Sequence, residues 1–214
     1  MSIKLHIGIK ESSDEITKRI LRGIRDELNP VFPKLVPKIV SRTKVLLFNS
    51  ITSQPEYESI RSGELRVHLG LPNGGDRLID IIEIWINSVE AEFKKFRISS
   101  ATGLTGGITL IAVRSDYEDV ISSNSAVFIT EKGEELHWLQ WLLNEGSNTI
   151  ISDYKIQLGP NLGRTGGAIM VTGAGWSIPG GFTGTPNNNF ITRAIANVEL
   201  DLIQDIRQIM EEAL

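Results

Sequence analysis

The sequence predicts an α+β fold with N-terminal helices, a small and mostly antiparallel sheet, and a long C-terminal helix. Apolar residues recur at helical spacing through much of 13–87. Short β-rich runs separated by glycine-containing turns occupy 89–171. Helical spacing then returns from about residue 192 to the last residue. Helices first, strands in the middle and one closing helix are typical of an α+β chain.

Four helical segments are expected in the N-terminal part. The first begins after Ser12 or Ser13, since serine is a suitable N-cap. Three prolines should separate it from the second, because each removes a backbone donor and crowds the preceding turn. These are Pro30, Pro33 and Pro37. The turn-forming cluster 72–76 should end the third segment. The expected spans are 13–28, 34–53, 55–67 and 77–87.

The middle of the chain is expected to form short strands. The predicted spans are 89–98, 108–113, 126–130, 153–158 and 168–171. The first two should pair as a hairpin, because Gly103 to Gly107 separates them. The last two flank the turn-rich stretch 159–167. A helix is predicted at 134–143, with acidic residues in its first turn. Asn189 or Thr192 should cap the long final helix.

Composition indicates a folded protein without disulfides. The 214 residues are 41% hydrophobic, contain no cysteine and carry a net charge of −4, which argues against nucleic acid as a bulk partner. Neither a signal peptide nor a membrane-spanning helix is expected. Residues 1–53 hold ten basic and five acidic residues, whereas 199–214 hold five acids against Arg207. These oppositely charged ends could pack within one chain, pack head to tail between copies, or remain as solvated helix faces.

One long segment has no charged side chain, although charged residues are 22% of the chain. It runs from Thr165 to Thr192 and is rich in glycine. Its flanking arginines and its large apolar side chains are Arg164, Arg193, Trp176, Phe182 and Phe190. Such a segment is costly to leave in water. It is therefore expected to pack either on the body of its own chain or on a neighbouring subunit.

Patterns that would indicate catalysis are weak. His6, His68 and His137 are far apart in sequence, and the acids beside His137 lack the second histidine of a helical metal site. Asp116 and Glu118 lie in an acidic stretch that is typical of a solvated loop. No metal, no cofactor and no enzymatic reaction are expected. A small hydrolase that uses some of these acids or His137 stays an alternative.

Two glycine-rich stretches are candidates for anion binding, because glycines let backbone amides approach an anion. Residues 163–167 read Gly-Arg-Thr-Gly-Gly, but they lack the Walker spacing and precede a predicted strand where a phosphate loop would precede a helix. Residues 102–107 lack the preceding strand and the following helix that a dinucleotide loop requires. Both stretches are better explained as turns or as subunit contacts.

Aromatic side chains give a stronger signal. Trp138 and Trp141 are three residues apart and share a helical face that extends to Glu145. Tryptophan, tyrosine and arginine dominate the energetics of protein–protein contacts. The two tryptophans could equally fill the core of the domain, and the sequence leaves both interpretations open.

Short motifs follow one another through the second half of the chain. They are Trp141-Leu142-Leu143-Asn144-Glu145-Gly146, Asp153-Tyr154, Gly163-Arg164-Thr165-Gly166-Gly167, Trp176-Ser177-Ile178-Pro179, Gly184-Thr185-Pro186 and Asn189-Phe190-Ile191-Thr192-Arg193-Ala194. An upstream element reads Arg61-Ser62-Gly63-Glu64-Leu65. This order resembles the tail-completion and head–tail joining (neck) proteins of tailed bacteriophages. In that group a Glu-Gly pair after a helix, a Pro-x-x-Phe-type segment and an Arg-Ala helix start recur.

The resemblance implies a structural virion protein that forms a ring, with a hexamer expected, in the neck between head and tail. Its partners would be copies of itself, the portal or connector, and the tail tube or tail terminator. DNA would only pass through the lumen, and neither a membrane nor a cofactor would be involved. The alternatives are a tail terminator that caps the tail tube, a small hydrolase, or a cellular binding module whose glycine loop grips a peptide or glycan.

On this interpretation, 1–54 form an N-terminal helical arm and 55–214 a tail-completion-like domain. A head-to-tail ring requires two different contact surfaces on each subunit. The uncharged segment and the oppositely charged ends are candidates for them. The residues expected at such interfaces are Trp138, Trp141, Glu145, Arg164, Trp176, Phe182, Asn189, Phe190 and Arg193.

Overall fold

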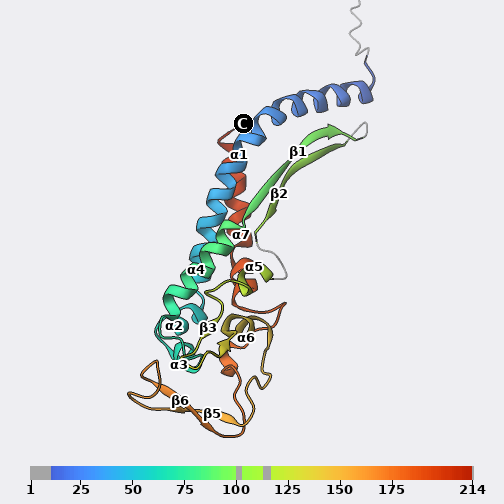
Figure 1. The fold of residues 1–214 in the computed structure, drawn as a ribbon. Coiled ribbons are helices and arrows are strands. Elements are labelled where there is room, and N and C mark those ends of the chain that lie inside the picture. Colours follow the sequence, from blue (N-terminus) through green and yellow to red (C-terminus); the bar gives the residue numbers. More distant parts are fainter. Residues whose placement is uncertain (1–10, 100–102, 113–116, 214) are drawn as a thin grey trace, which may run out of the picture. The chain divides into compact units, whose positions relative to one another are not determined.

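A computed structural model describes residues 11–99, 103–112 and 117–213 (Figure 1). It confirms the α+β class, with a long N-terminal helix, small antiparallel sheets and a C-terminal helix. The elements are α1 (Ser13–Thr52), α2 (Pro55–Arg61), α3 (Glu64–His68), α4 (Gly74–Asn87), β1 (Glu90–Ile98), β2 (Leu104–Ile111), α5 (Glu118–Ile121), β3 (Phe128–Ile129), β4 (Glu135–Leu136), α6 (Trp138–Asn144), β5 (Tyr154–Leu158), β6 (Ala168–Thr172), η1 (Gly180–Phe182, a 3-10 turn) and α7 (Phe190–Glu211).

The chain divides into two compact units built from interleaved segments. The first unit takes the described residues of Met1–Val40, Glu90–Leu110 and Ile206–Leu214, and the second those of Ser41–Val89 and Ile111–Asp205. The sequential division into 1–54 and 55–214 stays a prediction. None of the described helices combines the length and the apolar character needed to cross a membrane.

Helix α1 is continuous, so the prediction of two helices separated by prolines was wrong. The prolines are spaced by three and four residues, which places them on one face of the helix, and all three are exposed. The opposite face buries Phe32, Leu35 and Ile39. Burial of each such side chain contributes about 1.5–3 kcal/mol, comparable with the cost of about 3 kcal/mol for one helical proline. Packing therefore maintains the helix through the three prolines.

The first unit joins α1 to the hairpin β1–β2. The helix begins with a reciprocal cap in which Ser12 Oγ accepts the Glu15 N–H and Glu15 Oε2 accepts the Ser12 N–H. Farther along, the Asn29 side chain exchanges two hydrogen bonds with the backbone of Phe96 in β1, at 2.8 and 3.2 Å. Phe32 packs edge-on against Phe96 with ring centroids 4.9 Å apart. The predicted hairpin is confirmed, although Gly106 and Gly107 lie within β2 and not in the connection.

The second unit contains the main core. The apolar face of α4 and most of the apolar side chains of α6 lie in this core, together with Ile51, Ile60, Leu65, Trp176 and Ile191. Helix α4 begins at Gly74, three residues before the predicted start. Only glycine fits this position, because a Cβ there would lie 2.5 Å from the Ile60 carbonyl oxygen.

The predicted bounds of two helices in this unit were wrong. The segment 55–67 forms α2 and α3, because Gly63 interrupts it and the Ser59 hydroxyl accepts the Leu65 N–H at 2.9 Å, capping the second helix. The segment 134–143 is helical only from Trp138. Its beginning is strand β4, which pairs antiparallel with β3. The turn at Lys132-Gly133 lets the two strands pair before the helix starts.

The predicted strands 153–158 and 168–171 are confirmed as β5 and β6, and they pair antiparallel in a hairpin with Ile156 opposite Met170 at its centre. Asn189 caps α7, as predicted, because its Oδ1 accepts the backbone N–H groups of Ile191 and Thr192 at 3.0 and 3.1 Å. Thr192 Oγ1 accepts the Asn189 N–H in return, at 2.8 Å. The two proposed cap residues therefore act together.

Candidate assembly surfaces

The uncharged segment packs to a large extent on its own chain. Trp176 is 5% exposed and forms an antiparallel bridge with Ile151. Its ring meets the Trp141 ring edge to face, with centroids 5.8 Å apart. Its indole N–H donates to Nδ1 of the half-buried His68 at 3.5 Å. Trp176 therefore belongs to the core of the second unit.

The end of the segment is fixed by a buried polar cluster around Asn189, which is 1% exposed. The Asn189 Nδ2 group donates to the Thr185 carbonyl at 3.0 Å and to the Tyr117 hydroxyl at 3.2 Å. The next residue, Phe190, is also 1% exposed and packs edge to face on Trp85. This amide thus ties the preceding turn and the α5 region to the start of α7.

Both arginines that flank the segment bind within the chain. Arg193 forms an ion pair with Glu56, whose side chain is 2% exposed. Arg164 Nε donates to the Gly70 carbonyl at 2.6 Å, and its guanidinium lies 4.7 Å from the centre of the Phe128 ring. Burial lowers the pKa of Arg164 from its ordinary value, and Glu131 opposes that shift. The two arginines fasten the ends of the segment to α2 and to the turn after α3.

The other predicted interface residues are divided between core and surface. Trp138 is fully buried and donates its indole N–H to the Ser125 carbonyl at 2.9 Å. Phe182 is half-buried against the core, and Glu145 is half-buried at the C-terminal end of α6. The structure brings Trp141 and Trp176 together, but it does not gather all nine residues on one exposed surface. Their role at an interface stays a prediction.

Large exposed apolar side chains lie elsewhere, at positions that the sequence analysis did not select. On the hairpin β5–β6 they are Tyr154, Leu158 and Ile169; on α1 Val45 and Phe48; on α7 Leu200 and Ile203. A helical-wheel comparison could have found the α7 pair, because both lie away from the buried stripe of Ala194 and Val198. No comparable signal separates the exposed hairpin residues from core residues.

The residues considered for hydrolysis do not form a site in the described part of the chain. His137 Nε2 lies 3.6 Å from Glu135 Oε2. Asp116 lies outside the described residues, as does His6. Among the described residues, no group of three or more His, Cys, Asp or Glu side chains could hold a metal ion. Burial lowers the pKa of His68, and Glu64 opposes that shift.

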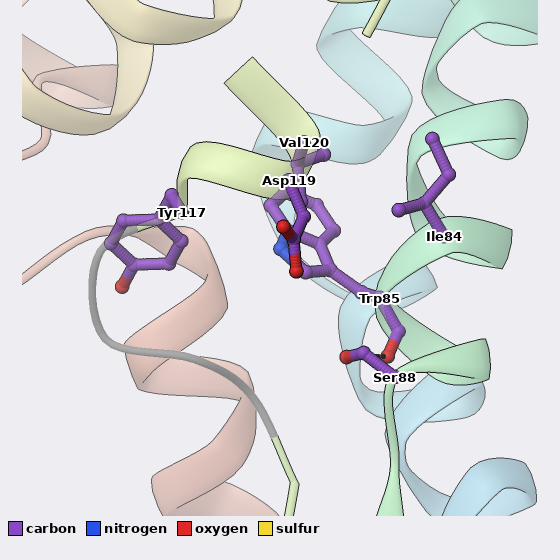
Figure 2. Close-up of a pocket in the computed structure, with 6 residues that line it drawn as sticks. All are labelled: Ile84, Trp85, Ser88, Tyr117, Asp119 and Val120. Carbon is purple, nitrogen blue, oxygen red and sulfur yellow. Dashed lines mark hydrogen bonds between the residues drawn. The ribbon is translucent and has the colours of Figure 1, made fainter. Parts of the chain in front are cut away.

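A small cavity lies between α4 and α5 (Figure 2). Its lining residues are Ile84, Trp85, Ser88, Tyr117, Asp119 and Val120. Its volume of ≈ 10 Å³ is at the lower limit for one water molecule. Ligand-binding sites usually offer about 300–1,000 Å³, so this cavity is far too small to hold a substrate.

No family model, no curated protein and no solved structure matches the chain.

Proposed function

We propose that this chain is a structural virion protein of a tailed phage, which assembles with copies of itself into a neck ring joining head to tail. One observation carries the proposal: the hairpin β5–β6 exposes Leu158, Tyr154 and Ile169 at 62%, 47% and 45%. Exposed apolar area of this kind on one small element often marks a contact with another protein. The hairpin is thus a candidate contact surface for another protein subunit.

The register of the hairpin explains why it stays incompletely covered. Side chains alternate between the faces of a strand, so Ile156 and its partner Met170 share one face, and both pack against the core. Tyr154 and Leu158 lie on that same face, but at its two ends they extend past the core and remain exposed. Ile169 lies on the opposite face.

The edges of the hairpin favour the same function. Its sheet has two strands in the described part of the chain, so each strand has an outer edge without a neighbouring strand. A two-stranded hairpin is marginally stable alone, and open edges are places where another chain can pair. A neck ring and a tail terminator would both use such a surface.

The test is the oligomeric state of the purified full chain, measured by native mass spectrometry and negative-stain electron microscopy. We expect a closed ring, and a strict monomer at high concentration would contradict the proposal. The ring should bind isolated portal rings or tail tubes. A ring that binds neither would be evidence against a position in the neck.

The hairpin is tested by Leu158→Glu and Ile169→Glu, which should weaken assembly because each introduces a charge into the contact. Ile129→Glu is the matched control, since Ile129 is equally exposed, at 62%, but lies in β3. Thermal unfolding of each variant should match that of the wild type. If the Ile129 variant weakens assembly as strongly as the other two, the hairpin is not the specific contact.

A further inference from the structure

We infer that copies of this chain contact each other by placing the outer face of α1 in one copy against the outer face of α7 in the next. The inference rests on the proposed self-assembly and names two surfaces that build it. The α1 surface consists of Lys44, Val45 and Phe48. The α7 surface consists of Glu199, Leu200 and Ile203. All six residues belong to the second unit.

The inner faces of the two helices are already used within one chain. Ser50 Oγ donates to the Ala194 carbonyl at 2.8 Å, and Arg42 Nε pairs with Asp205 Oδ2 at 2.5 Å. Thr43 and Leu47 are buried on the same side of α1. These contacts run in opposite directions along the two helices, so α1 and α7 pack antiparallel. Part of the charge difference between the ends of the chain is therefore neutralised inside the subunit.

The outer face of α1 is apolar with a basic border. Val45 is 48% exposed and Phe48 is 37% exposed, and a spacing of three residues places them side by side on the helix. Lys44 lies one turn before Phe48 and forms no ion pair with the described residues. The buried residues Thr43 and Leu47 lie on the other side of this helix. This face thus combines apolar area with an unpaired positive charge.

The outer face of α7 has the same layout with the opposite charge. Leu200 is 73% exposed, the highest value among the exposed large apolar side chains of the described residues, and Ile203 is 50% exposed three residues later. Glu199 lies one turn before Ile203. It forms no ion pair with the described residues. The buried stripe of this helix, which includes Val198, lies on the opposite side.

The α1 face is complementary in charge to the α7 face, whereas neither face is complementary to a second copy of itself. Each offers two apolar side chains three residues apart with a charged residue one turn before the second. Contact between two α1 faces would bring Lys44 against Lys44, and contact between two α7 faces would bring Glu199 against Glu199. Like charges placed together at an interface disfavour that pairing. An α1 face on an α7 face instead joins opposite charges around a shared apolar centre.

The charges on the two faces also determine the symmetry of the assembly. When one surface of a subunit binds a different surface of the next, the contact is heterologous and repeats until the rotation closes a ring. The charge pattern thus favours head-to-tail assembly, as a ring requires. The partner is a second copy of this chain. An unrelated protein with an acidic or basic helix is the other possible occupant of each face, and the experiment below separates the two.

The test exchanges the charges in the full-length protein. Lys44→Glu makes both faces acidic, whereas Glu199→Lys makes both basic. Each variant alone should assemble at least tenfold more weakly than the wild type in sedimentation velocity and native mass spectrometry. An equimolar mixture should recover assembly, because the two variants can alternate around a ring with an even number of subunits.

A third variant carrying both substitutions provides a stricter check. Its faces are again opposite in charge, so it should assemble alone while failing to mix with wild-type subunits. Lys34→Glu is the matched control, because Lys34 is also exposed on α1 without a described ion pair. It should assemble like the wild type, and all variants should keep the wild-type melting temperature.

The outcomes distinguish this inference from the proposed function. If the wild type assembles and the charge variants assemble equally well, the α1–α7 contact is wrong while self-assembly stands. If each variant loses assembly but the mixture does not recover it, the two faces do not bind each other, and another partner covers them. If the wild type itself stays monomeric at high concentration, both the proposed function and this contact fail.

Discussion

Replacing Asn189 with aspartate should destabilise the protein, although aspartate is as good an N-cap as asparagine at an exposed helix start. The Oδ1 atom of Asn189 caps α7 through the backbone N–H groups of Ile191 and Thr192, and an aspartate oxygen can take over that role. The Nδ2 group cannot be replaced in this way, because aspartate has no donor. The substitution therefore separates the capping contribution from the buried donor contribution.

The expected loss of stability depends on which buried polar groups each substitution leaves without a hydrogen-bond partner. Loss of Nδ2 removes donors from the Thr185 carbonyl at 3.0 Å and from the Tyr117 hydroxyl at 3.2 Å, inside a site that is 1% exposed. The Thr185 carbonyl keeps the Asn188 N–H at 3.0 Å, but the carboxylate oxygen that replaces Nδ2 faces this carbonyl oxygen with no donor between them. A buried polar group left unpaired costs about 1–3 kcal/mol, so Asn189→Asp should cost about 2 kcal/mol. Asn189→Ala also loses the cap, worth about 1 kcal/mol, and should cost about 3 kcal/mol.

Urea and thermal unfolding followed by tryptophan fluorescence can measure this effect. All four tryptophans lie in the second unit, which also contains Asn189, so their emission reports the relevant transition. For a chain of this size, about 2 kcal/mol corresponds to a decrease of about 4–8 °C in Tm. Asn187→Asp is the control, because Asn187 is exposed just before the same helix and its replacement should change stability by less than about 0.5 kcal/mol. Equal stability of the two aspartate variants would refute the role assigned to the buried amide.

Two further predictions concern buried titratable groups. The pKa of His68 is lowered by burial, and its neutral Nδ1 accepts the Trp176 N–H. The unfolded chain therefore binds this proton more readily, and stability should be complete above the unfolded pKa of about 6.5 and decrease as pH falls below it. His68→Gln should reduce that decrease in pH-dependent unfolding, and an unchanged pH profile would contradict the assignment. Arg193→Met leaves the Glu56 carboxylate buried without its cation and should destabilise by about 3 kcal/mol. Adding Glu56→Gln should recover part of the loss, and strictly additive effects in the double-mutant cycle would show that the pair is not coupled.

Elements with local signals were predictable from the sequence. The cap of α7 was found because Asn189 and Thr192 precede a run of helical periodicity, and the structure shows both in reciprocal hydrogen bonds. Strands β5 and β6 were found because two β-rich runs flank a glycine-rich turn. In such cases the residues that decide the structure lie within a few positions of each other. The continuity of α1 depends instead on packing against side chains that are distant in sequence, such as Phe96, and its prediction failed for that reason.

The contact surfaces were less predictable than the fold. Trp176 lies among glycines and suggested an intersubunit anchor, but its neighbours are Ile151, Trp141 and His68 of its own chain. Leu158 looks in sequence like any other apolar residue of a short strand, yet it is 62% exposed. Sequence reveals which residues are apolar, but only the packing partners decide which of them remain in water.

The oppositely charged ends of the chain form ion pairs within one subunit and also leave charges free for contacts between subunits. Two of the ion pairs that the charge difference suggested form within the subunit: Lys38 with Glu212 in the first unit, and Arg42 with Asp205 in the second. As exposed pairs they add little to stability, but the Arg42 pair and the buried face beside it set the rotation of α1 against α7. A helix whose inner face is fixed presents its outer face in one orientation, which lowers the entropy that assembly must overcome. Weak internal pairs can thus support the proposed α1–α7 contact by orienting it. Arg42→Gln should for this reason weaken assembly more than it lowers Tm, and an assembly constant equal to that of the wild type would contradict this coupling.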